Sequence, residues 1–187
     1  FNYSLDTSGF FANGTARAAL ERVGDVLESR IDDDLAAISP GGGNTWTAIL
    51  FHPSTGNVHS VEDLRVAANT VIIFVGARSN ISGGGLAAGG PGTYGAYPLS
   101  NSPAFINAFQ TRGEAGMNVN SPQLSTDFGV WGGSLTFNAG IDWHFGADPP
   151  PGNVADFESL AMHEIGHLLG FGTAGSWQRH VRGNSFT

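Results

Sequence analysis

The spacing of apolar residues predicts a short strand and then a long helix in the first 40 residues. Apolar side chains at every second position are typical of a half-buried strand over residues 1–6. In residues 15–38 the apolar positions recur at steps of three and four, which predicts a helix with one buried face. Asn13 or Thr15 would cap its start, and the glycine run after Pro40 would end it.

Several shorter apolar segments follow, and most of them read as strands. Residues 45–52 form one strand, and residues 57–61 pair back with it as a hairpin after a Pro-Ser-Thr-Gly turn. Residues 70–77 are the most continuous apolar run, which favours a central position in a sheet. Residues 134–138 predict a further strand, and residues 103–112 a short amphipathic helix.

Two segments differ in character from these strands. Gly83–Gly95 is rich in glycine but carries no phosphate-binding motif, so we interpret it as a surface loop that lacks catalytic groups. Near the end of the chain, residues 154–170 predict a helix that Asn153 or Asp156 can cap and that Gly170 helps to end.

These elements predict an α+β fold in a single domain that spans residues 1–187. We expect one twisted mixed sheet of about four or five strands, a number set by counting the apolar segments. The helix over 15–38 would back the sheet, and the helix over 154–170 would lie below it. The segment after the second helix is short, so most of the domain would be an upper subdomain, with the C-terminal subdomain short or missing.

Composition removes several classes of function. The net charge of −8 argues against nucleic-acid binding, which needs a basic patch. All eight basic residues are arginines, which excludes a P-loop lysine and Schiff-base chemistry, and the absence of cysteine excludes thiolate ligands and thiol catalysis. No apolar run is long enough to span a membrane.

The strongest chemical signal is the sequence His163-Glu164-Ile165-Gly166-His167 inside the last predicted helix. Residues four apart lie on the same face of a helix, so His163 and His167 would point the same way, as two ligands of one zinc ion require. Glu164 lies at the edge of that face, where a carboxylate can act as general base without binding the metal.

A catalytic zinc ion normally takes three protein ligands, so one more is needed. After the second histidine of the motif there is no Asp, Glu or Cys, which leaves His180 as the conventional downstream ligand. His144, Asp142 and Asp148 are upstream candidates. A ligand beyond Thr187, or no third protein ligand, remains an open alternative.

Two other polar clusters are interpreted without a metal. His52 and His59 flank the predicted hairpin turn and are expected to face solvent rather than share an ion. The run Asp32-Asp33-Asp34 lacks the alternating ligand spacing of a calcium loop, so we interpret it as a solvated turn of helix.

The motif and its surroundings resemble a known family. His163-Glu164-x-x-His167-x-x-Gly170-Phe171-Gly172 resembles the metzincin zinc metallopeptidases, most closely leishmanolysin-like peptidases and exported bacterial proteins with HEIGHxLGFGT before a tryptophan. The resemblance implies a zincin-like fold, Zn²⁺ as cofactor, Glu164 as general base and a secreted or cell-surface bacterial protein. Thr173 stands where most metzincins have their third histidine, and both methionines precede the motif, so no methionine turn follows it.

Together these features predict a zinc-dependent endopeptidase that acts on peptide or protein substrates. Glu164 would take a proton from a water activated by the metal and pass it to the leaving amine. The substrate would lie extended along an edge strand near residues 133–138. Two alternatives remain: a catalytically idle surface or matrix protein that keeps the fold, and a metal-binding module without hydrolytic activity.

Overall fold

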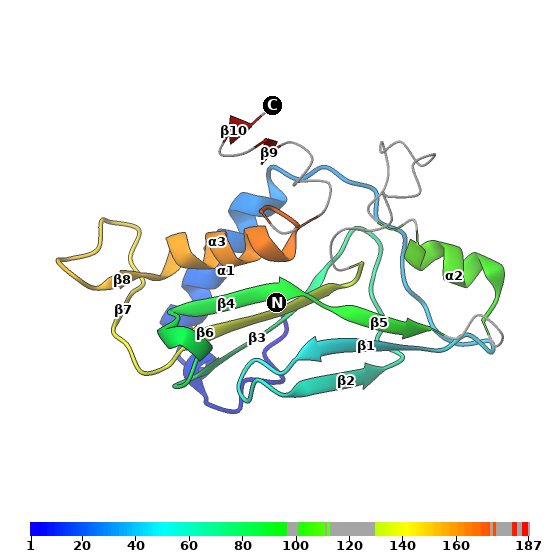
Figure 1. The fold of residues 1–187 in the computed structure, drawn as a ribbon, viewed down its shortest axis with the longest axis horizontal. Coiled ribbons are helices and arrows are strands. Elements are labelled where there is room, and N and C mark those ends of the chain that lie inside the picture. The colour runs from blue at the N-terminus through cyan, green and yellow to red at the C-terminus, as the bar shows by residue number, and fades with distance from the viewer. Residues whose placement is uncertain are drawn as a thin grey trace.

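The computed structural model describes residues 1–96, 101–110, 112, 130–172, 174, 181–182 and 185–186. The fold is mixed α+β, as the sequence predicts, and the two longest helices lie on one side of the sheets (Figure 1). Among the described residues, no helix is both long and apolar enough to span a membrane.

Two three-stranded sheets form the centre of the fold. Their strands are β1 (Trp46–Phe51), β2 (Val58–Glu62), β3 (Ile72–Arg78), β4 (Ala87–Pro91), β5 (Thr93–Ala96) and β6 (Gly132–Asn138). Strand β1 pairs antiparallel with both β2 and β5. Strand β6 pairs parallel with β3 and antiparallel with β4. The prediction of one sheet with four or five strands is therefore wrong.

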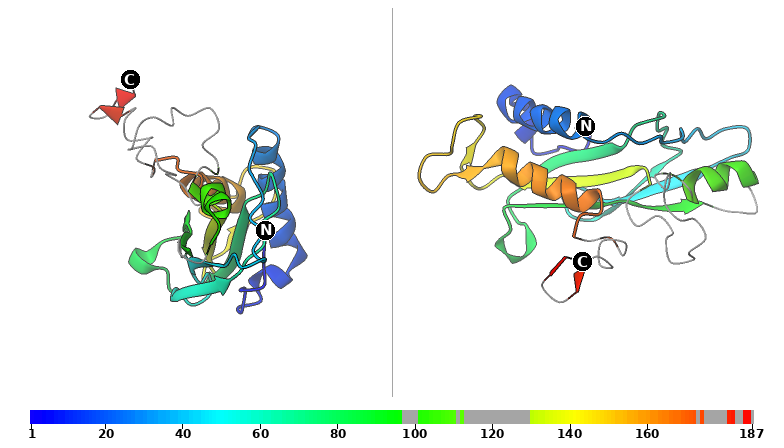
Figure 2. Two further views of the ribbon diagram at one scale, coloured as in Figure 1. Left: turned by 90° about the vertical axis from the view of Figure 1, so that its right-hand side faces the viewer. Right: turned by 90° about the horizontal axis from the view of Figure 1, so that it is seen from above.

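Helices and short strands complete the described fold. The helical segments are η1 (Phe10–Ala12), α1 (Gly14–Glu28), η2 (Ser82–Gly84), α2 (Pro103–Gln110) and α3 (Phe157–Leu168). Two short pairs of strands join β7 (Trp143–His144) to β8 (Ala155–Asp156), and β9 (Val181–Arg182) to β10 (Ser185–Phe186). Helices α1 and α3 contact each other along part of their length (Figure 2).

The sheet β3-β6-β4 is covered on both faces, which explains its apolar sequence. Ile73 and Val75 of β3 belong to the core that the sheet forms with α1 and α3. Phe74, between them, belongs to a second core that includes Trp46 and Leu50 of β1. Alternate residues of one strand thus enter two different cores, because successive side chains of a strand point to opposite faces. The layers are helices, then this sheet, then β2-β1-β5.

Helix α1 is shorter than the predicted helix over 15–38. It begins after Asn13, whose side chain accepts a hydrogen bond from the Thr15 backbone, and it ends at Glu28. Three consecutive aspartates follow from Asp32, and negative charge is unfavourable at the C-terminal end of a helix dipole. Ile38 joins the second core through a bridge to Val66. The predicted helical turn at the aspartates is therefore wrong.

Two other predictions about strands need correction. Residues 1–6 form no strand; only Asn2 bridges to β3, through hydrogen bonds with Ile73 and Val75. Strand β3 is not central, because β6 lies between β3 and β4. Strand β6 begins with two glycines, so its sequence is a shorter apolar run than that of β3 and did not indicate a central position.

The glycine-rich segment Gly83–Gly95 is not a surface loop. Most of it forms β4 and β5, which follow each other and belong to the two different sheets. At the break between them lies Gly92, where a Cβ atom would come within 2.0 Å of the Trp131 ring. At Gly89 and Gly92 neighbouring elements occupy the space that a side chain would need.

A buried arginine connects segments that are distant in the sequence. Arg112 is 1% exposed, and its guanidinium donates to backbone carbonyls of Ala36 at 2.7 Å and Thr70 at 2.6 Å. It also donates to the carbonyls of Ala67 and Val130. Burial lowers the pKa of this guanidinium. Among the described residues it forms no salt bridge, so carbonyl dipoles stabilise its charge.

Replacing this arginine should destabilise the protein strongly. We expect Arg112→Met to lower the free energy of unfolding by about 2 to 4 kcal/mol, because several buried carbonyls lose their donor. Arg30→Met, at an exposed position, is the matched control and should change it by less than about 0.5 kcal/mol. Urea unfolding followed by circular dichroism measures both, and equal stability of the two variants would contradict the stabilising role of Arg112.

Candidate metal centre

The start of helix α3 is fixed by a cap and by aromatic packing. The Asp156 side chain accepts a hydrogen bond from the Ser159 backbone at 3.1 Å, so Asp156 is the capping residue of the two that the sequence offered. Phe157 is fully buried and stacks on Phe137 of β6, with ring centroids 4.4 Å apart. The helix therefore begins at a defined point on the sheet.

An ion pair joins the first turn of α3 to α1. The Arg22 Nε atom donates to the Glu158 carboxylate at 2.8 Å, and the Arg22 Nη2 atom donates to the Phe145 carbonyl at 2.7 Å. The side chains are partly exposed, so the pair adds little stability by itself. It links α3 to α1 and to the segment before β8.

The two histidines of the motif lie together on α3. Their Nε2 atoms are 3.0 Å apart, and their ring centroids are separated by 4.4 Å. The Nδ1 atom of His167 lies 2.8 Å from the Phe171 carbonyl. A histidine that binds metal through Nε2 usually donates its Nδ1 proton to such an oxygen, which fixes the ring orientation. The donor set and its arrangement fit two ligands of one zinc ion.

Glu164 lies between the histidines in sequence but has a different environment. His163 is exposed, whereas Glu164 is only 9% exposed. The Glu164 Oε2 atom accepts a hydrogen bond of 2.7 Å from the Gly89 backbone of strand β4. The sequence offered no sign of this contact, because Gly89 falls in the segment that we interpreted as a loop. That this glycine lies beside the helix of the motif becomes clear only once the strand pairing is known.

The chain leaves α3 through left-handed glycines. Gly170 has φ +97° and Gly172 has φ +76°, values that side chains disfavour. Between them, the Phe171 backbone N–H donates to the Gly166 carbonyl at 2.9 Å. This turn places the Phe171 carbonyl beside the His167 ring, so the glycines serve the orientation of that histidine.

The structure does not add a third ligand from the residues that it describes. In that part of the chain, no group of three His, Cys, Asp or Glu side chains is arranged to hold a metal ion. His144 instead lies with Nε2 at 2.8 Å from the Asp148 carbonyl and 3.6 Å from its carboxylate. His180 lies outside the described residues.

His52 and His59 form a second, separate pair at the β1–β2 hairpin. Their rings are 5.3 Å apart and nearly perpendicular. The Nδ1 atom of His52 accepts a hydrogen bond from the Ser54 backbone, so the proton of the neutral ring is on Nε2. Burial lowers the pKa of His52, and the proximity of His59 lowers it further. To bind a metal through Nε2, His52 would need the other tautomer and would lose the hydrogen bond from Ser54, which disfavours a shared ion.

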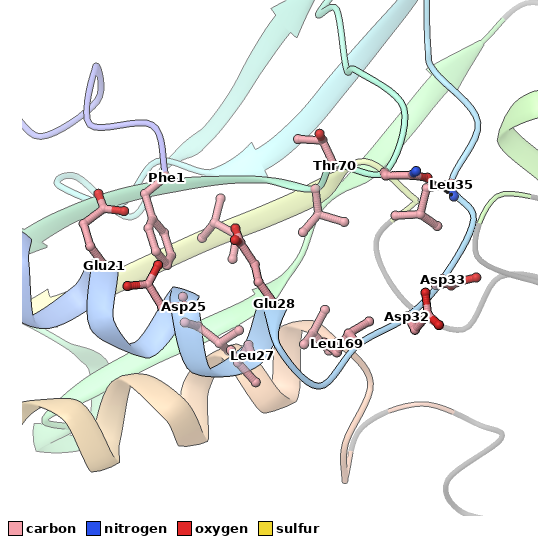
Figure 3. A pocket seen from close by; sticks show the side chains of 16 residues that line it. Phe1, Glu21, Asp25, Leu27, Glu28, Asp32, Asp33, Leu35, Thr70 and Leu169 are labelled. Atoms are coloured by element: carbon pink, nitrogen blue, oxygen red, sulfur yellow. Dashed lines mark hydrogen bonds between the residues drawn. The ribbon is translucent and has the colours of Figure 1, made fainter.

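A groove lies on the other side of α3. It has a volume of about 550 Å³ and contains Ile165 and Leu169 of α3, Phe1, and the acidic side chains Glu21 and Asp25 of α1 (Figure 3). Ile165 and Leu169 are each two positions from a motif histidine, which is about half a helical turn. The groove therefore faces away from the histidine pair and supplies nothing to it.

Comparison with models of protein families, with curated proteins and with solved structures finds no match to this chain.

The cap of α3 provides a first test of how the site is held. Asp156→Ala should lower the free energy of unfolding by about 1 kcal/mol, because the first turn loses a hydrogen-bond acceptor. Asp156→Asn keeps an acceptor oxygen and should stay within about 0.5 kcal/mol of the parent. Chemical denaturation distinguishes them, and equal losses in both variants would show that the carboxylate charge matters more than the cap.

The second histidine pair predicts a pH effect. Because the folded-state pKa of His52 lies below its ordinary value of 6.5, the folded protein binds a proton there less readily than the unfolded chain. This contribution to stability is full above pH 6.5 and is lost as the pH falls below it. His59→Gln should raise the pKa of His52, and His144→Gln should leave it unchanged. Titration of the ring protons by NMR reads both values directly.

Proposed function

We propose that this protein is a zinc-dependent endopeptidase with a zincin-like catalytic domain. The observation that carries the proposal is the convergence of two imidazole Nε2 atoms, 3.0 Å apart on α3, with a carboxylate at the adjacent position. His163 and His167 would hold the metal, and Glu164 would be the general base. The resemblance to metzincins supports the same roles.

Each residue has a separate task in this proposal. Zinc, when bound, supplies a Lewis acid that brings the pKa of water to about 7. Glu164 takes a proton from the attacking water and gives it to the leaving amine. The hydrogen bond from Gly89 fixes the position of Oε2, and we assign the proton transfer to Oε1. The Phe171 carbonyl keeps the His167 ring oriented through Nδ1.

A third ligand is part of the proposal. A catalytic zinc ion takes three protein ligands and keeps one position open. We propose His180 for this place, since the sequence after His167 has no other conventional ligand. Substitution of His180 should then reduce zinc affinity as His163→Ala does.

The substrate would be an extended peptide, but not beside residues 133–138. Those residues belong to β6, which is paired on both sides and cannot accept another strand. Strand β4, between Ala87 and Pro91, is an edge strand of its sheet, and Glu164 binds its outward N–H at Gly89, so a peptide would pair with the other outward groups of this edge. The strand contacts α3, so a peptide added there would run close to the metal centre. We also propose that the protein is exported to the cell surface or secreted by a bacterium, as the resemblance implies.

One experiment tests both the metal and the base. Purified protein should contain one zinc ion per chain by mass spectrometry and should cleave an unstructured protein such as casein. Glu164→Ala should keep the zinc and lose about 10²-fold to 10⁴-fold in kcat/KM. His163→Ala should lose the zinc as well, and Glu62→Gln, on an exposed strand position, is the matched control.

The outcomes also separate the alternatives. Zinc binding without hydrolysis would favour a metal-binding module. The observation that favours this alternative is that the described residues bring together only two histidines and no third ligand. A protein that binds no zinc and cleaves nothing would be a catalytically idle member of the fold. Activity that Glu164→Ala leaves unchanged would disprove the proposed mechanism.

A further inference from the structure

The direction of the hydrogen bonds along β4 is set by its pairing with β6. The Leu86 carbonyl accepts from the Asn138 backbone at 2.8 Å, and the Gly92 backbone donates to the Gly132 carbonyl at 2.9 Å. In an antiparallel pair, alternate residues point their N–H and C=O groups toward the partner strand. Residues with odd numbers between them therefore point these groups outward, and Gly89 is one of them.

The outward N–H of Gly89 is bound by the predicted general base. Glu164 Oε2 accepts this hydrogen at 2.7 Å, and the carboxylate is largely shielded from water. Hydrogen bonds to a charged acceptor are stronger than those between neutral groups. The contact joins two segments 75 positions apart, so the strand fixes the position of one oxygen of the side chain.

The absence of a side chain at residue 89 is equally specific. A Cβ atom there would lie 2.6 Å from the Glu164 carbonyl oxygen and 2.9 Å from its Cβ atom. Both distances are below any normal contact, and the first involves backbone that cannot rotate away. A Cβ atom on the neighbouring Gly90 would have nothing within 4 Å. Close approach of β4 to α3 therefore requires glycine at 89 and not at 90.

We propose that Gly89 is a positioning residue for Glu164 in the reaction. Its N–H holds Oε2, and its missing side chain lets the Glu164 backbone lie against the strand, which leaves Oε1 for proton transfer. This inference rests on the proposed function of Glu164 as general base. It adds that β4, the strand proposed to bind the peptide, also orients the base through one backbone N–H.

The first test compares two glycine substitutions, one at Gly89 of β4 and one at Gly95 of β5. Gly89→Ala should lower kcat about tenfold to a hundredfold, because a displacement of about 1 Å is enough to misplace a catalytic group. KM and zinc content should stay close to those of the parent, since neither the metal ligands nor the substrate strand loses a group. Gly95→Ala, on β5, where an added Cβ atom has nothing within 4 Å, should leave kcat, KM and zinc content unchanged. Equal kcat values for the two variants would overturn the proposal.

A second measurement does not depend on activity or on the folding of the alanine variant. The Gly89 amide should exchange its proton at least about fivefold faster in Glu164→Ala than in the parent, because one hydrogen bond is lost. Glu164→Gln keeps an acceptor oxygen and should retain the slow exchange. Exchange rates that are equal in the parent and in Glu164→Ala would overturn the proposal.

The two measurements separate failure of this inference from failure of the proposed function. A parent protein without peptidase activity would remove the reaction, and with it the positioning role, even if the amide exchange showed the hydrogen bond. An active parent that depends on Glu164, combined with no effect of Gly89→Ala on kcat, would leave the proposed function intact and remove this inference alone.

Discussion

The position of helix α3 depends on the burial of one side of it against the sheet. Phe157, Ala161 and Leu168 are fully buried on this side, and Ile165 is 2% exposed. Burying a large apolar side chain contributes about 1.5 to 3 kcal/mol, so this face outweighs every polar contact that the helix makes. Once it is buried, the rotation of the helix is determined, and the exposed His163 must lie on the outside. The candidate metal centre is thus oriented by apolar residues that lie on the opposite side of the helix.

Sequence reasoning succeeded for elements that carry their own periodicity and failed for those defined by their neighbours. The hairpin β1–β2 and helix α2 lie within a few residues of their predicted ranges, because turn residues and apolar spacing mark them locally. Strands β4 and β5 were missed, since glycine and alanine give no alternating pattern. The requirement for glycine at 92 and 89 comes from Trp131 and Glu164, which lie 39 and 75 positions away in the sequence.

The candidate site divides in the same way. His163, Glu164 and His167 are linked by helical spacing, so their placement on one helix followed from the sequence alone. The environment of Glu164 did not follow, because it depends on a strand whose pairing is long-range. The upstream candidate His144 is bonded to Asp148 within its own loop, an arrangement that spacing alone leaves undetermined. Position within an element is local information, whereas the surroundings of a side chain are not.

The junction at Gly92 limits how this protein can change during evolution. Strands β4 and β5 meet there, and the Trp131 ring occupies the place where a side chain would be. Trp131 is itself fully buried, and its indole N–H donates to the Thr93 carbonyl at 3.0 Å. A larger residue at 92 is therefore tolerable only if residue 131 becomes smaller, and a smaller residue at 131 opens a cavity between the sheets. The two positions should accordingly vary as a pair among homologous sequences. Either substitution made alone should lower the stability of the protein.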